Sequence, residues 1–215
     1  MELRLVSVNV GLPREIGVYL GAPVLSGFGK TPVAAPSVFV GLTNIEGDAQ
    51  ADLTVHGGPD KAVYCYPADH WPWWEREKAL PCRPASFGEN LTVEGADETM
   101  VTIGDRFRWG DALLEVSQPR APCFKFAIYA KRADGPALMT TSGRTGWYFR
   151  VVREGRAPVG NSTLVRESMA GGPTVRDAFM AALNARTAAD IVRRVAETPA
   201  LAASWRDAVS RRLQR

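Results

Sequence analysis

The sequence predicts a mainly β protein, an antiparallel barrel or sandwich, followed by a small helical segment. Many short apolar or alternating runs, separated by Gly and Pro, occupy residues 1–170, and this spacing is typical of antiparallel β architectures. After Gly171, Gly172 and Pro173 the apolar residues recur with the period of about 3.6 residues that marks amphipathic helices. We therefore expect a β domain over residues 1–170 and a three-helix segment over residues 171–215.

Seven runs in the first domain carry the strand signal. They are LRLVSVNV (3–10), SVFVGLTN (37–44), AVYCY (62–66), LTVEG (91–95), DRFRWGD (105–111), ALLEVS (112–117) and WYFRVVREG (147–155). One helix interrupts them, from Pro67 to about Ala79, because Pro suits a first helical turn and Trp71, Trp74 and Lys78 have helical spacing. We expect its Trp side chains to pack in a core.

Three short helices are predicted in the tail. Thr174 can cap the first, which runs to about Asn184, and Thr187 with Asp190 forms a box-like start for the second. Thr198 begins the third, where an apolar residue recurs at every fourth position: Leu201, Trp205, Val209 and Leu213. Helices of this length are not stable alone, so they must pack on each other or on the β domain.

Length and composition indicate a folded protein without a membrane segment. The chain has 215 residues, of which 46% are hydrophobic, enough for one substantial core. No apolar run approaches the roughly 20 residues of a membrane helix, and the first ten residues, MELRLVSVNV, alternate and carry charges, unlike a secretory signal. Cys65, Cys82 and Cys123 fit neither a disulfide framework nor a CxxC metal site. We expect reduced thiols and a cytoplasmic location.

The net charge of +3 is unevenly distributed. Residues 171–215 hold eight Arg against four Asp or Glu, a local +4, which leaves −1 for residues 1–170. Short Arg-rich helices are compatible with a nucleic-acid-binding tail, but these cations are mixed with acids and one helical face is apolar. Nucleic acid is therefore disfavoured, and the tail is interpreted as a structural clamp or as a docking surface for a partner protein.

Cys123 lies in the stretch SQPRAPCFK, directly after a strand-like run. Pro119 and Pro122 restrict the backbone before it, and Arg120 and Lys125 place cations on both sides. Nearby cations favour the thiolate, which is the reactive and metal-binding form of cysteine. The alternative is a small buried apolar residue, the usual fate of a free cysteine.

Three Gly-containing stretches hold the other candidate residues. His56, Gly57, Gly58 and Lys61 form a segment whose amides and ammonium could hold an oxyanion, or a turn with a satisfied histidine. The FGENLT stretch offers Glu and Asn side chains for a heterocycle or for a turn. The GKTPV stretch at 29–33 offers Lys30 to an anion or to solvent.

Together, six motifs resemble the MOSC domain family, named after the C-terminal domain of molybdenum cofactor sulfurase. They are GKTPV (29–33), GDAQAD (47–52), HGGPDKAVY (56–64), FGENLT (87–92), IGDRF (103–107) and LEVSQPRAPCFK (114–125). The chain is most similar to the bacterial N-hydroxylaminopurine-resistance branch, whose members carry a helical C-terminal segment. The resemblance implies a MOSC-type β-barrel with few helices.

The resemblance also implies a molybdopterin-type molybdenum cofactor with one cysteine bound to molybdenum, which matches Cys123. This makes Cys123 the catalytic and metal-binding residue. Lys30, Asn90 and Arg120 are then candidates for contacting the pterin or its phosphate. The stretch His56, Gly57, Gly58 and Lys61 is expected to line the same mouth.

The implied activity is reduction of N-hydroxylated bases, such as hydroxylaminopurine, or of related N-oxygenated small molecules. The alternative is a non-catalytic carrier of the cofactor or of sulfur. An iron–sulfur module needs about four closely grouped cysteines, and with three scattered ones we expect no iron–sulfur cluster in this chain. Electrons would then come from a separate flavoprotein or ferredoxin-type donor.

Overall fold

The computed structural model describes residues 1–214 and is built on a closed β-barrel. Its strands are β1 (Glu2–Val10), β6 (Val63–Pro67), β7 (Leu91–Glu94), β8 (Arg106–Trp109), β9 (Ala112–Pro119), β10 (Trp147–Arg153) and β12 (Thr163–Ser168). The order around the barrel is β12-β8-β9-β10-β6-β7-β1, and pairing of β1 with β12 closes it. The pair β6–β7 is parallel, and its neighbours in the barrel are antiparallel. The mainly β prediction is confirmed as a seven-stranded barrel.

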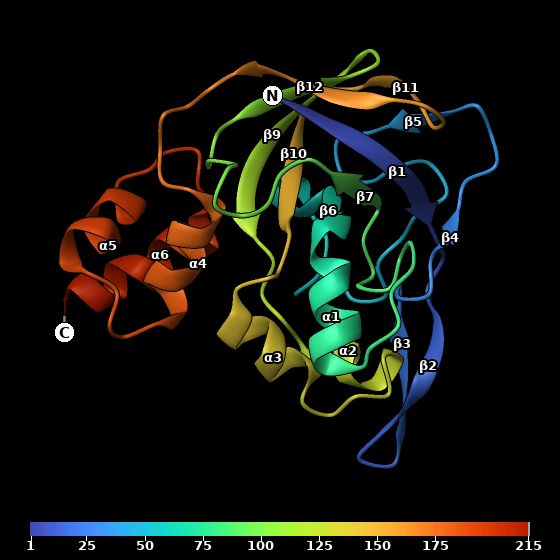
Figure 1. Cartoon of the computed structure of the whole chain (residues 1–215), viewed down its shortest axis with the longest axis horizontal. Coiled ribbons are helices and arrows are strands. Elements are labelled where there is room, and N and C mark those ends of the chain that lie inside the picture. The colour runs from blue at the N-terminus through green and yellow to red at the C-terminus, as the bar shows by residue number, and fades with distance from the viewer. Residues whose placement is uncertain (215) are drawn as a thin grey trace.

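Short strands extend the barrel at its edges. The strand β4 (Thr31–Pro32) pairs with the end of β1, and β5 (Ser37–Val40) pairs with β11 (Gly155–Pro158). A hairpin of β2 (Arg14–Tyr19) and β3 (Ala22–Ser26) projects from the body of the molecule (Figure 1).

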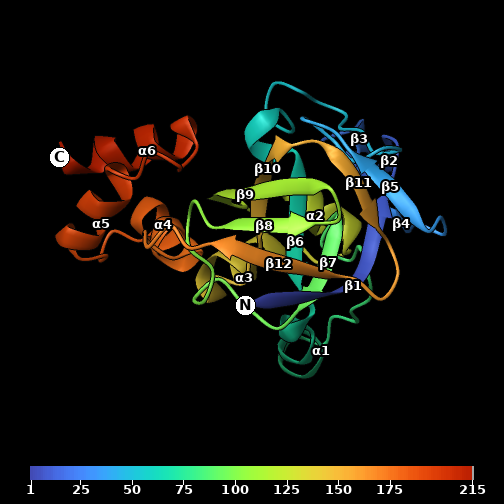
Figure 2. The ribbon, with the colours of Figure 1, turned by 90° about the horizontal axis from the view of Figure 1, so that it is seen from above.

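The helices form two groups. Below the barrel in Figure 1 lie α1 (Trp71–Lys78), α2 (Phe124–Tyr129) and α3 (Gly135–Ser142), with the 3-10 turns η1 (Pro59–Lys61) and η2 (Ala68–His70) elsewhere along the chain. The second group is α4 (Val175–Leu183), α5 (Ala189–Ala196) and α6 (Ala203–Leu213). Seen from above, this group lies on the side away from β2, β3 and β5 (Figure 2).

One continuous apolar core joins the barrel to the second helical group. Leu3, Phe107 and Phe149 fill the barrel, and the same cluster of buried side chains includes Phe179 and Trp205 from the helices. The backbone amide of Ala202 donates to the carbonyl of Ser117 on β9 at 2.9 Å, which ties the helices to the barrel wall. The predicted packing of the short helices is therefore confirmed.

Each of the seven runs predicted as strands contains a strand in the structure, but several short elements were not predicted. The run 37–44 ends as a strand at Val40, and the run 147–155 breaks after Arg153 into β10 and β11. The hairpin β2–β3, the strand β12 and the helices α2 and α3 were not predicted. Both hairpin strands are largely exposed, so they lack the regular apolar alternation on which strand prediction depends.

The helix predicted from Pro67 starts instead as η2 and continues as α1, with Trp74 fully buried as expected. In the tail, Thr174 caps α4 through a capping box with Asp177. The Thr187 and Thr198 caps are wrong, because their hydroxyls donate back to carbonyl groups of the preceding helices, both at 2.8 Å.

The helices α5 and α6 therefore begin after Ala188 and Ala202, without side-chain caps. The apolar face of the third helix is confirmed at Leu201, Trp205 and Val209, whereas Leu213 is 45% exposed. Within residues 1–214, none of the helices combines the length and the hydropathy needed to cross a bilayer.

Replacing Thr174 with Ala should lower the free energy of unfolding by about 1 kcal/mol, because the amide of Asp177 loses its side-chain acceptor. Urea unfolding followed by circular dichroism measures the change. Thr141→Ala is the matched control, since that hydroxyl bonds only carbonyl groups within α3. Equal midpoints for the two variants would show that the box contributes nothing to stability.

Candidate functional site

The largest cluster of candidate residues surrounds a pocket of about 660 Å³, part of it open to solvent. The pocket lies on the outer face of β6 and β10, not inside the barrel. Side chains alternate along a strand, so Val63, Cys65 and Phe149 enter the barrel core while Tyr64 and Tyr148 face the pocket. The barrel therefore supplies one wall of the pocket from its outer face.

A second, smaller core supports the pocket floor. It contains Phe28, Tyr66, Trp74, Phe87 and Phe126, with Met139 from α3. The rings of Tyr66 and Phe87 stack at 3.9 Å, and the indole of Trp74 donates to the Tyr66 hydroxyl at 2.6 Å. This packing fixes Phe28 and the segments that reach the pocket from α2 and from the loop before β7.

Cys123 is half-buried at the start of α2, where its extended backbone forms the N-cap. Burial alone would raise the pKa of the thiol. A side-chain hydrogen bond with His56, the charge of Arg120 and the backbone amide of Lys125 outweigh it and bring the pKa down to about 7. A large share of this sulfur is thiolate at neutral pH, which supports the functional interpretation of the cysteine over the inert one.

Arg120 is a buried cation without a carboxylate partner among the described residues. Its side chain is at one pocket wall and the residue is 4% exposed. One guanidinium nitrogen contacts the sulfur of Met139 at 3.3 Å, and the group lies 5.2 Å from the ring centre of Tyr64. It also hydrogen-bonds the Tyr148 hydroxyl. A buried charge paired only with weak acceptors favours an anionic ligand in the pocket.

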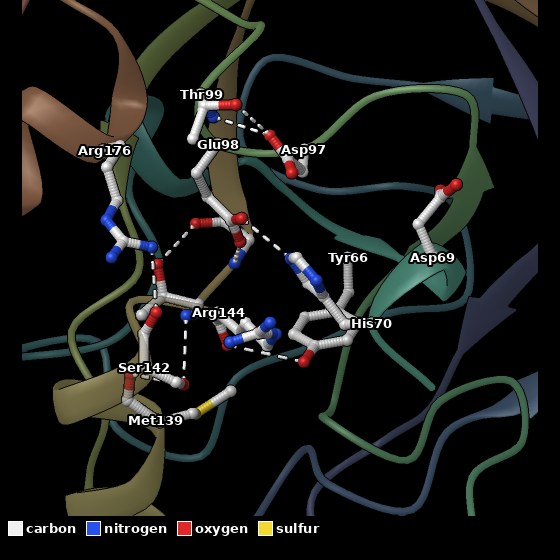
Figure 3. A network of polar contacts seen from close by, with 12 residues as sticks. Tyr66, Asp69, His70, Asp97, Glu98, Thr99, Met139, Ser142, Arg144 and Arg176 are labelled. Atoms are coloured by element: carbon white, nitrogen blue, oxygen red, sulfur yellow. Dashed lines mark hydrogen bonds and ion pairs between the residues drawn. The ribbon is translucent and has the colours of Figure 1, made fainter. Parts of the chain in front are cut away.

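The backbone behind Arg120 is held by the buried carboxylate of Glu98, whose contacts are drawn in Figure 3. The amide of Gly146 donates to Glu98 at 2.6 Å, and the amide of Arg120 donates to the carbonyl of Gly146 at 3.3 Å. Glu98 also contacts His70 at 2.7 Å, so His70 is structural as expected. A Cβ atom at Gly146 would lie 2.2 Å from the carbonyl oxygen of Cys65, so the close approach of β6 requires glycine.

Lys30 and Asn90 line the pocket but also serve the fold. The Lys30 ammonium pairs with Asp48, and both side chains are buried. Asn90 donates to Asp48 at 2.9 Å and accepts from the amide of Tyr64 at 3.0 Å. Burial lowers the pKa of Lys30, with Asp48 opposing the shift. Both polar atoms of the Asn90 amide are occupied within the protein, so this residue joins β6 to the 48–49 loop.

The stretch His56 to Lys61 forms the opposite rim. His56, Gly57 and Lys61 line the pocket, whereas Gly58 lies just outside its lining. Gly57 has φ of +88°, and a Cβ atom there would lie 2.9 Å from the Gln50 side chain, so glycine is required. The Lys61 ammonium donates to the carbonyl of Val55 at 2.8 Å, which stabilises the loop.

The sequence reasoning missed the aromatic walls of the site. Tyr64 and Tyr148 lie with ring centres 5.1 Å apart, and Phe28 covers the other side of Arg120 at 5.6 Å. The run VYCY did carry a signal, because Tyr64 and Tyr66 are two residues apart on a strand and therefore share a face, opposite to that of Val63 and Cys65. With Lys125 added, the lining holds four Lys or Arg side chains and no Asp or Glu.

Comparison with known proteins places this site in a family. A MOSC domain match spans residues 52–163, over half of the chain. The chain belongs to the MOSC family. A second match, to the YiiM-like 3-alpha helix domain, spans residues 173–215 of this chain.

Individual relatives support the same branch of the MOSC family. The uncharacterized protein YflK of Bacillus subtilis is 41% identical over 202 residues, which cover 93% of this chain and 90% of YflK. The crystal structure of YiiM from Geobacillus stearothermophilus superposes with a TM-score of 0.81 at 34% identity, covering 98% of this chain and 99% of that one. A protein named Reductase from Gibberella moniliformis is 36% identical over 69% of this chain but only 27% of its own length. MOSC domains are associated with binding of the molybdenum cofactor.

Alkylation of Cys123 by iodoacetamide should show a midpoint near pH 7, because only the thiolate reacts. Replacing His56 with Gln should raise this midpoint and slow alkylation at pH 7. Burial raises the pKa of Cys123, and without His56 fewer groups oppose that rise. Peptide mass spectrometry separates Cys123 from Cys82, whose pKa burial raises to about 12. Lys61→Gln is the control, and a midpoint that moves equally in both variants would contradict the role of His56.

Replacing Asp48 with Asn should lower the free energy of unfolding by about 3 kcal/mol, because Lys30 is left buried without a counter-charge. The double variant Lys30→Met with Asp48→Asn should recover part of the loss, which urea unfolding would detect. Additive losses in the double variant would show that the two side chains do not stabilise each other.

Proposed function

We propose that this MOSC protein is a molybdenum-cofactor-dependent reductase of N-hydroxylated bases such as hydroxylaminopurine, or of related N-oxygenated compounds. The observation that carries the proposal is the pairing of Arg120, a buried cation without a carboxylate, with Cys123, a thiol poised as thiolate. The first favours an anionic group in the pocket, and the second offers a soft ligand to a redox metal.

The residues present fit such a cofactor. Arg120 would neutralise its phosphate or dithiolene charge, Lys61 and Lys125 add positive charge at the mouth, and Cys123 would bind molybdenum. Within residues 1–214 there is no group of three or more His, Cys, Asp or Glu side chains that could hold a metal ion. The pterin must therefore supply the other ligands, which agrees with a single cysteine at this place.

When bound, molybdenum supplies the two-electron redox chemistry. Reduction of a hydroxylamine consumes two electrons and two protons and releases the amine and water. Protons must therefore reach the nitrogen and the departing oxygen from the pocket.

Two side chains of the pocket are placed to handle protons. His56 lines the pocket and helps to lower the pKa of Cys123. The Tyr148 hydroxyl lies beside Arg120, and burial raises its pKa against the opposing effect of that guanidinium, so it stays protonated at neutral pH. The hydroxyl of Tyr64, in contrast, is committed to the carbonyl of Thr145 at 2.7 Å.

The second candidate is a non-catalytic carrier of the cofactor or of sulfur. A cysteine of pKa about 7 in an open pocket is also suited to hold a persulfide. Cofactor-loaded protein that never reduces N-hydroxylated substrates with any electron donor would favour this candidate. The reductase, in contrast, requires a separate flavoprotein or ferredoxin-type donor, and we propose that it works in the cytoplasm.

Cys123→Ala should abolish bound molybdenum while leaving the thermal unfolding midpoint close to that of the wild type, because the side chain is only half-buried. Metal analysis and pterin fluorescence, on protein expressed in a host that makes the cofactor, measure the loss. Cys82→Ala is the matched control and should retain molybdenum. Full molybdenum in the Cys123 variant would overturn the assignment of this residue as the ligand.

A further inference from the structure

Exposed apolar side chains stand on three segments that lead directly into the pocket lining, at Ser26, at His56 and at Cys123. Within residues 1–214, these form a set that we call the apolar rim: Leu12, Val18, Tyr19, Leu20, Leu25, Leu53, Val55 and Phe124, exposed by 44% to 90%. The rings of Tyr19 and Phe124 lie 4.8 Å apart, which joins the β2–β3 hairpin to the residue that follows Cys123. Lys125 donates to the carbonyl of Leu25 at 3.0 Å and strengthens this junction.

Leu20 at the hairpin tip is costly for the isolated protein in two ways. Leu20 and Gly21 form the two-residue loop, and both have positive φ, +50° and +81°. A turn with positive φ at both positions favours Asn or Asp before Gly, because their short polar side chains hydrogen-bond the nearby backbone. The apolar side chain of leucine makes no such bond. Leu20 is also 90% exposed. A strained and largely exposed leucine does not stabilise this fold, and its presence is explained if the side chain is covered by a partner.

We propose that the apolar rim is the docking surface for an acidic electron-donor protein. This inference rests on the proposed function, because a reductase without its own electron source must receive electrons near Cys123. The rim begins at the residue after that cysteine. The helices α4–α6 lie on the far side of the molecule from the hairpin (Figures 1 and 2), so the alternative of donor docking on the tail places the donor away from the site.

Charge selects the kind of partner. On or beside the rim segments stand three cations, Arg14, Lys61 and Lys125, against two acids, Glu15 and Asp52. None of these five side chains belongs to an ion pair among residues 1–214. The pocket behind them is lined by cations without acids. An apolar centre bordered by unpaired cations fits a protein whose own contact face carries carboxylates around its redox group.

The test uses Leu20→Asn, because Asn suits the turn and should leave the melting temperature unchanged or higher. Met169→Asn is the matched control, since Met169 is 67% exposed and lies outside the rim. Cofactor-loaded proteins reduce hydroxylaminopurine with either reduced methyl viologen, a small reductant, or two acidic protein donors, a 2Fe–2S ferredoxin and a flavodoxin. Donor binding is measured separately by calorimetry at low and high salt.

We expect Leu20→Asn to raise the KM for a protein donor by about fivefold or more, to weaken its binding to the same extent, and to leave viologen-supported turnover unchanged. Salt should weaken donor binding to the wild type. Equal rates and affinities in the wild type and Leu20→Asn, or binding of neither donor, would overturn the proposal.

Two further results would assign the rim to another occupant and overturn the proposal. A wild-type dimer that dissociates in Leu20→Asn during sedimentation would assign it to a second copy of this chain. A raised KM for hydroxylaminopurine with viologen would assign it to the substrate. If cofactor-loaded wild-type protein is inactive with viologen, the proposed reductase function is contradicted. Even then, loss of donor binding in Leu20→Asn would support the docking surface.

Discussion

The site depends on one unusual placement, a guanidinium that is buried without a carboxylate. Such a group normally destabilises a fold, because its desolvation is not compensated. Here Arg120 lies against the ring faces of Phe28 and Tyr64 and beside the sulfur of Met139, which offer weak but numerous attractions. These contacts, all from the second core, hold the cation in place while leaving its charge available to a ligand.

The barrel serves this site from the outside. The interior of β6 and β10 is closed by core side chains, and alternation along the strands directs Tyr64 and Tyr148 outward. A packed barrel is rigid, so the aromatic wall has a fixed position. Loops and α2 then cover it from the other side. Most of the candidate residues therefore stand on loops and α2, whereas the strands contribute Tyr64 and Tyr148.

Much of this arrangement could be predicted from the sequence, and the failures share a cause. Regular alternation located the seven strand regions, and the stretch around Cys123 indicated a thiol on a constrained backbone between two cations. The hairpin β2–β3 was missed because most of its side chains are exposed and β2 shows no alternation of buried and exposed residues. The burial of Arg120 and the internal role of Asn90 depend on contacts between residues far apart in the chain, such as Asn90 with Asp48, and no local pattern encodes those.

Closure of the barrel has a consequence for the order of events during synthesis. The first strand pairs with β12, where Leu3 lies opposite Leu164, so the barrel cannot close until nearly four-fifths of the chain has left the ribosome. Lys30 and His56 emerge early, yet the wall that faces them is complete only when β10 has paired with β6 and β9. The wall of this pocket therefore forms late in synthesis, after every motif segment that lines the pocket has emerged.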